Sequence, residues 1–146
     1  MTDHPLIHTY KPLDELIEDF GYLDDWEDRY AYLIDLGKEL PGLPEEYKTP
    51  EHQVKGCTSQ IWLVHHQVDQ DEGPVHYLAA DSDAFIVRGL VSIVLSAYSG
   101  KNRAEIAGLD LSNIFSQIGL ERNLSISRRN GFASMIQKVR GFAAEG

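Results

Sequence analysis

The sequence has 146 residues, 42% of them hydrophobic and 10% aromatic, which is enough apolar surface for one core. We therefore expect a single domain over residues 1–146. The net charge of -10 disfavours partners that are themselves negatively charged, namely nucleic acid and anionic membrane surfaces. No window approaches the roughly 20 apolar residues that a membrane span requires, so we expect a soluble, cytoplasmic protein.

Two amphipathic helices are expected at the start of the chain. The first follows Pro12 and stops at Gly21. The second has Asp24 and Glu27 as its expected capping pair and ends near Gly37. Their apolar faces comprise Leu13, Leu16, Ile17 and Phe20 in the first helix, and Trp26, Tyr30, Leu33 and Ile34 in the second.

A proline-rich connection over 41–50 leads into three expected strands, 53–55, 60–68 and 75–80. Alternate residues of a strand point to opposite faces of its sheet. Apolar residues stand at both sets of positions at the start of the long strand: Trp62, Val64 and Val68 in one set, and Ile61 and Leu63 in the other. We therefore expect an antiparallel sheet that is covered on both faces in this region.

The strongest apolar run, 85–98, is too long for an ordinary strand and is expected to be a buried helix. The Asp-Ser-Asp run at 81–83 comes directly before it and suits an N-terminal cap. Arg88 and Gly89 are the only interruptions of its apolar character. This run is therefore the expected centre of the core.

Three shorter patterns predict the remaining helices. Asn102 and Glu105 are placed to cap a short helix over 103–107, a second helix closes at Gly119, and the last follows Ser125. The last two have apolar faces formed by Leu111, Ile114, Phe115 and Ile118, and by Phe132, Met135, Ile136, Val139 and Phe142. Together the expected helices and strands predict an α+β fold, with a three-stranded antiparallel sheet and helices packed mainly on one side.

Cys57 is the only cysteine, and it lies between two expected extended segments. Gly56 before it can adopt backbone angles that strain other residues, which allows Cys57 to be presented at a loop tip. A buried cysteine that acts as a small apolar side chain is the alternative. Because one cysteine cannot form an internal disulfide, any sulfur chemistry must involve a second molecule.

The segment 52–63 resembles the active-site segment of the SufE family, whose pattern is roughly Val-x-Gly-Cys-x-Ser-Gln-x-Trp. The matching residues are Val54, Gly56, Cys57, Ser59, Gln60 and Trp62. Further similar segments, at 32–41, 81–90 and 124–131, extend the resemblance over nearly the whole chain. The resemblance implies a SufE/IscU-like fold.

The resemblance also implies a sulfur carrier. A PLP-dependent cysteine desulfurase of the SufS or CsdA type holds a persulfide, and the SufE protein takes its terminal sulfur onto Cys57 and stimulates the desulfurase. The sulfur then passes to an iron–sulfur cluster scaffold or another acceptor. Such a protein is a transfer partner and activator, not a stand-alone enzyme, with no cofactor besides the transient persulfide. One accessible thiolate is sufficient for this exchange.

Two residues accompany Cys57 by resemblance. Arg128 matches the arginine of the family's Ser-Arg pair, and a positive charge near a thiol of pKa about 8.5 would increase the thiolate fraction. Asp83 matches a family aspartate near the cysteine. The alternatives are a surface charge or structural ion pair for Arg128 and a helix cap for Asp83. An ion pair between Asp83 and Arg128 that orients the cysteine loop would agree with both the functional and the structural alternatives. Lys55 is expected to point into solvent.

One residue departs from the family pattern, and three histidines need an assignment. Ile126 stands where the family commonly has proline, which concerns the start of the last helix and not the chemistry. His65 and His66 are expected to point to opposite faces of a strand, which disfavours joint metal binding, and one of them is a candidate cross-strand partner of His76. We expect no metal site.

Three other functions remain as alternatives. A cluster scaffold would need about three or four thiolate or imidazole ligands, where this chain offers one cysteine. A cysteine hydrolase would need a histidine beside Cys57, and the sequence does not place His52 or His76 in space. A regulatory module would bind and stimulate a desulfurase without carrying sulfur.

Overall fold

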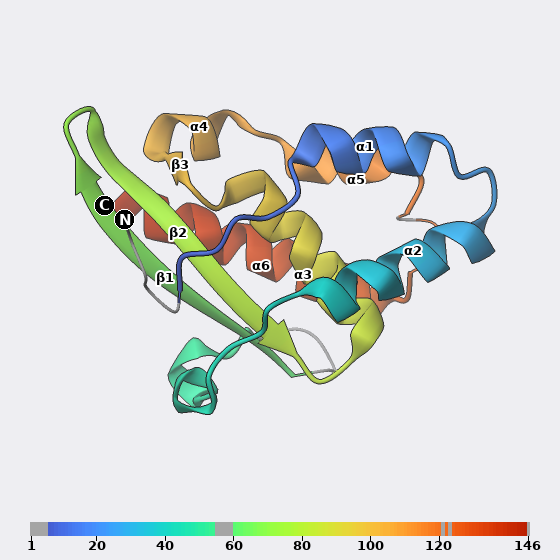
Figure 1. Cartoon of the computed structure of the whole chain (residues 1–146), viewed down its shortest axis with the longest axis horizontal. Coiled ribbons are helices and arrows are strands. Elements are labelled where there is room, and N and C mark those ends of the chain that lie inside the picture. The colour runs from blue at the N-terminus through green and yellow to red at the C-terminus, as the bar shows by residue number, and fades with distance from the viewer. Residues whose placement is uncertain (1–5, 55–59, 121, 123, 146) are drawn as a thin grey trace.

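The computed structural model describes residues 6–54, 60–120, 122 and 124–145, and it has the expected α+β architecture. The sheet contains β1 (Ile61–Gln70), β2 (Gly73–Ser82) and β3 (Lys101–Asn102), antiparallel and in that order. Figure 1 shows the β1–β2 hairpin as a long twisted ribbon along one side of the molecule, with the helices beside it.

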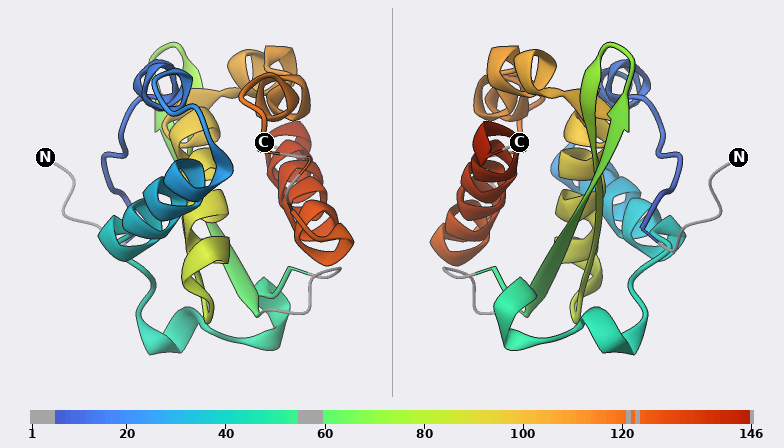
Figure 2. Two further views of the ribbon diagram at one scale, coloured as in Figure 1. Left: turned by 90° about the vertical axis from the view of Figure 1, so that its right-hand side faces the viewer. Right: turned by 90° about the vertical axis from the view of Figure 1, so that its left-hand side faces the viewer.

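The helices follow the sequence pattern closely. They are α1 (Leu13–Gly21), α2 (Trp26–Glu39), α3 (Phe85–Tyr98), α4 (Arg103–Gly108), α5 (Leu111–Gln117) and α6 (Ile126–Glu145), with short 3-10 turns η1 (Glu45–Tyr47) and η2 (Pro50–His52). Figure 2 shows α3 against the hairpin, with α2 on one side of it and α6 on the other. None of the helices in the described ranges is long and apolar enough to cross a membrane.

The third strand of the sheet is not the one that the sequence predicts. Among the described residues of the expected strand, Gln53 forms an isolated bridge to Trp62 directly after η2. The third strand is instead β3, which follows α3 and pairs with Val75 and His76 near the start of β2. Lys55, the end of the expected strand, lies outside the described residues.

Helices α2 and α3 pack with their backbones in close contact. A Cβ atom added to Gly89 would lie 2.2 Å from the carbonyl oxygen of Leu33, and one added to Gly37 would lie 2.4 Å from that of Phe85. Both approaches are far shorter than side-chain contacts allow, so only glycine fits. Gly89, an interruption in the sequence pattern, is thus a packing residue.

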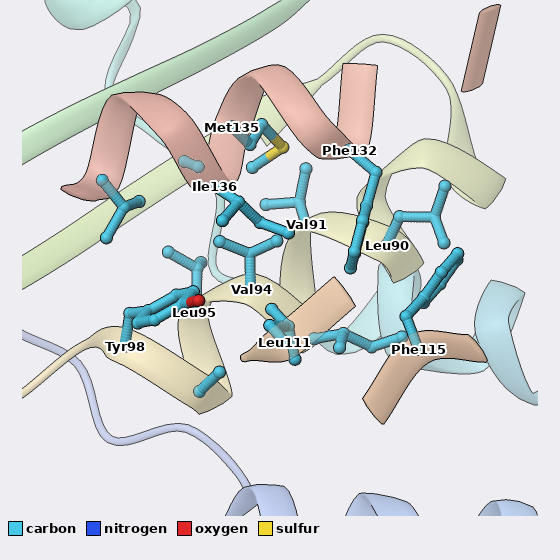
Figure 3. Close-up of a cluster of buried hydrophobic side chains, with 14 of the residues drawn as sticks. Leu90, Val91, Val94, Leu95, Tyr98, Leu111, Phe115, Phe132, Met135 and Ile136 are labelled. Carbon is cyan, nitrogen blue, oxygen red and sulfur yellow. The ribbon is translucent and has the colours of Figure 1, made fainter. Parts of the chain in front are cut away.

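Both faces of β1 are covered near its start, as the alternation predicts. Ile61 and Leu63 belong to the main core under the helices, whereas Val64 packs in a smaller cluster on the other face with Leu43 of the 41–50 connection. Figure 3 shows part of the main core, where α3, α5 and α6 interleave side chains: Leu90, Val91, Val94, Leu95, Tyr98, Leu111, Phe115, Phe132, Met135 and Ile136.

The helix caps are partly as expected. The capping box of Asn102 and Glu105 is present at the start of α4. At the start of α2 the cap is Asp25, whose carboxylate accepts the backbone N–H of Asp28 at 2.9 Å, and not Asp24. Asp24 and Asp25 are consecutive, so the sequence pattern does not distinguish them, and Trp26, the first residue of α2, packs against the main core.

Candidate functional site

The residue expected to react, Cys57, lies in the segment 55–59, which we call the cysteine segment and which is outside the described residues. The structure describes both of its neighbours, Val54 and Gln60. The site is therefore built from the residues that hold these two positions.

The chain enters the cysteine segment from a fixed position. Val54 is buried, and its backbone N–H donates to the carbonyl oxygen of Ile61 at 2.8 Å. Before it, the carbonyl oxygen of Gln53 accepts a hydrogen bond from Lys138 Nζ of α6 at 3.5 Å. The residues that connect Val54 to Ile61 thus begin and end at neighbouring backbone positions.

The chain leaves the segment at Gln60, whose backbone is held on both sides. Its N–H donates to Asp83 Oδ1 at 3.0 Å. Its carbonyl oxygen accepts from Ser82 Oγ at 2.6 Å and from the backbone N–H of Asp83 at 3.3 Å. We call Ser82 and Asp83, with these three bonds, the Gln60 clasp.

Asp83 does not cap the central helix, which corrects one alternative drawn from the sequence. The N-cap residue of α3 is Ala84, and no side chain caps this helix. The carboxylate of Asp83 instead turns to the N–H of Gln60, which lies beyond the last β1–β2 pair and has no partner in the ladder. Asp83 therefore contacts the residue that follows the cysteine segment.

A buried ion pair lies directly behind the clasp. Asp81 is only 4% exposed, and its carboxylate lies 3.1 Å from Arg88 Nη1 and 3.3 Å from Lys48 Nζ. Arg88 also donates to the carbonyl oxygens of Gly37 and Leu40, at 2.9 and 2.8 Å, at the end of α2. In the sequence pattern Arg88 only interrupts the apolar run. A charged side chain inside a buried helix nevertheless indicates that the fold must supply it with an ion-pair or hydrogen-bond partner.

Arg128 lies half-buried in the first turn of α6, and its backbone N–H donates to Ser125 Oγ at 3.2 Å. Figures 1 and 2 show that α6 begins at the same end of the molecule as α3, so Arg128 and Asp83 share this end. Among the described residues no ion pair joins them, so the expected Asp83–Arg128 pair is absent. The helix begins at Ile126 without the proline that the family commonly has there.

The histidines form a pair within the sheet. His65 Nε2 lies 2.7 Å from His76 Nδ1, and the His65 ring stacks on Phe142 of α6 with 4.6 Å between centroids. Burial, then the neighbouring His76 and His66, lower the pKa of His65 to about 4. Burial also lowers the pKa of His76. Both rings are therefore neutral at pH 7.

The described residues, which do not include Cys57, show where His52 and His76 lie and whether acidic and histidine side chains cluster. No group of three or more histidine, cysteine or acidic side chains among them is placed to hold a metal ion. His76 is engaged with His65, and His52 Nδ1 contacts Tyr47 O and Thr49 Oγ1 at 2.9 and 3.1 Å. Neither contact involves the Gln60 clasp.

Comparisons with known proteins agree with the sequence motif. The family model described as "SufE: Fe-S metabolism associated domain" matches residues 14–143. An uncharacterized SufE-like protein of Rhizobium etli is 58% identical over 128 residues, which cover 88% of this chain and 86% of that protein. A second, from Rhizobium meliloti, is 51% identical over 131 residues, covering 90% and 94%.

A solved structure shares the fold at low sequence identity. The solution structure of a hypothetical protein from Thermus thermophilus superposes with a TM-score of 0.70 and 16% identity, covering 91% of this chain and 93% of that one. At this identity the likeness concerns the fold alone. The family model and the two relatives show that the chain belongs to the SufE family, which is associated with iron–sulfur metabolism.

Proposed function

We propose that this protein is a sulfur carrier that works with a PLP-dependent cysteine desulfurase. The thiolate of Cys57 attacks the terminal sulfur of the desulfurase persulfide, the bond between the two sulfur atoms breaks, and the desulfurase cysteine leaves as a thiolate. Cys57 then holds the persulfide, and a downstream iron–sulfur scaffold or other acceptor takes the sulfur. No external oxidant or reductant is needed, because the sulfur moves at the same oxidation level.

One structural observation carries this proposal beyond family membership. The residue after the cysteine segment, Gln60, is fixed through both of its backbone groups by Ser82 and Asp83. Sulfur transfer is faster when the reactive thiol is held in position, because the attacking and leaving sulfur atoms must align. We assign Asp83 to this anchoring and Arg128 to raising the thiolate fraction of Cys57.

The proposed reaction belongs in the cytoplasm, where thiols are kept reduced. The single cysteine fits a carrier, because a second thiol in the chain could attack the persulfide, form an internal disulfide with Cys57 and release the cargo sulfur as sulfide. The charge of -10 fits a protein partner and not nucleic acid.

A regulator that only binds the desulfurase is the second candidate, and Cys57→Ser separates the two. We expect this variant to fold and to bind the desulfurase, but to accept no sulfur and to leave turnover at the level of the desulfurase alone. The measurement is the rate of cysteine desulfuration with wild-type protein, with the variant, and with neither. Stimulation by Cys57→Ser equal to that by wild-type protein would favour the regulator and contradict the carrier.

A further inference from the structure

We infer that Ser82 is a positioning residue for the transfer proposed above, acting on the cysteine segment through the backbone of Gln60. The inference rests on that proposed function and adds a residue that the motif does not single out. Ser82 is the last residue of β2, is 6% exposed, and pairs in register with Ile61, the first residue of β1. Its side chain therefore reaches across the end of the hairpin to Gln60.

The hydroxyl of Ser82 makes the short bond of the clasp. Its Oγ donates to the carbonyl oxygen of Gln60 at 2.6 Å, whereas the second donor to that oxygen, the N–H of Asp83, lies at 3.3 Å. Short contacts of this kind are the stronger hydrogen bonds. Without the hydroxyl, the Gln60 carbonyl would retain only the longer bond.

The backbone of Ser82 is held by the buried ion pair of Asp81 and Arg88. Its backbone N–H donates to Asp81 Oδ1 at 2.8 Å, and the same carboxylate oxygen lies 3.1 Å from Arg88 Nη1. A continuous series of contacts thus runs from Arg88 in α3 through Asp81 and Ser82 to Gln60. Because the series starts at the buried ion pair, it holds Gln60, the residue that follows the cysteine segment.

Ser92 provides a matched control for the loss of a buried hydroxyl. It is 7% exposed, and its Oγ also donates to a backbone carbonyl oxygen, that of Leu36 at 3.2 Å. This bond joins α3 to α2 and has no contact with Gln60. Ser82→Ala and Ser92→Ala therefore each remove a hydroxyl that donates to a backbone carbonyl oxygen, at different places, although Ser82 Oγ also accepts the N–H of Ala84 at 3.4 Å.

The test combines a structural and a kinetic measurement on the full-length protein. Loss of one hydrogen bond changes an equilibrium by about fivefold. We therefore expect Ser82→Ala to accelerate exchange of the Gln60 amide proton about fivefold, measured by NMR. We also expect it to slow single-turnover sulfur acceptance at saturating desulfurase by about fivefold, with the half-saturating concentration unchanged. Ser82→Thr, which retains a hydroxyl, should restore both values.

Ser92→Ala should lower the melting temperature comparably but change neither measurement. Faster Gln60 exchange with unchanged sulfur acceptance in Ser82→Ala would overturn the positioning role and leave the proposed function intact. Effects of Ser92→Ala equal to those of Ser82→Ala would also overturn it, because they would reflect general loss of stability. Wild-type protein that accepts no sulfur would overturn the proposed function itself.

Discussion

Asp81 and Arg88 form a buried ion pair, with Oδ1 and Nη1 3.1 Å apart, at the junction between β2 and α3. The pair joins three parts of the chain, because Arg88 also binds the last carbonyl groups of α2 and Asp81 binds Lys48 of the 41–50 connection. It therefore organises the region directly behind the Gln60 clasp.

Arg88→Ala should be strongly destabilising. The change leaves the Asp81 carboxylate buried with Lys48 as its remaining cation, and breaking a buried pair costs about 3–5 kcal/mol. Lys11→Ala is the control, because Lys11 and Asp19 form an exposed pair that contributes less than about 1 kcal/mol. Urea unfolding measures both. Equal losses of unfolding free energy would show that the buried pair has no special structural role.

Gly89→Ala should destabilise the protein through the α2–α3 contact. The added methyl group would lie 2.2 Å from Leu33 O, so the helices must separate, at a cost of about 1–3 kcal/mol. Gly141, in α6, has no atom within 4 Å of an added Cβ, so Gly141→Ala should stabilise by about 0.4–1 kcal/mol. Thermal melts distinguish the two variants, and an upward shift of the melting temperature in both would contradict the close α2–α3 contact.

The His65–His76 pair should make stability depend on pH. The pKa of His65 in the folded protein is about 4, whereas in the unfolded chain it is about 6.5. The unfolded state therefore takes up a proton that the folded state does not, and stability falls as the pH decreases from about 6.5 toward 4. The contribution is fully present above pH 6.5.

His65→Gln isolates this effect from the titration of carboxyl groups. The unfolding free energy of the variant should fall less steeply between pH 6.5 and 4 than that of the wild-type protein. Chemical denaturation at several pH values gives both slopes. Identical slopes would mean that His65 is protonated as readily in the folded protein as in the unfolded chain.

Arg128→Ala should slow sulfur acceptance more than it lowers stability. We propose above that Arg128 raises the thiolate fraction of Cys57, so we expect removal of its charge to lower that fraction at neutral pH and to decrease the rate several-fold. Alkylation of the thiol by a small reagent over a range of pH reports the same change. Arg129→Ala is the matched control, because Arg129 is an exposed neighbour in the same helical turn. Unchanged alkylation and acceptance rates in Arg128→Ala would assign Arg128 a structural role only.

Much of the fold could be predicted from local patterns. The bounds of α3, the start of α6 and the two covered faces of β1 follow from long apolar runs or regular alternation. The third strand could not be predicted in this way, because β3 has two residues and its pairing with β2 depends on where α3 ends. Such a short strand carries no periodic signal of its own.

The candidate site was predictable as a motif but not as a set of contacts. The residues of the motif locate Cys57 and, by resemblance, Asp83. The partner of Asp83 was not predictable, because Gln60 is 23 positions away and meets it only when β1 and β2 pair. The same holds for Arg88, which reaches the end of α2 across 48 positions of sequence.

Mass spectrometry of the protein after incubation with a cysteine desulfurase and free cysteine tests the central proposal most directly. We expect one added sulfur atom on the peptide that contains Cys57, removed by a reducing thiol and missing in Cys57→Ser. A desulfurase that turns over and is stimulated by the protein, while Cys57 remains an unmodified thiol throughout, would contradict the proposal.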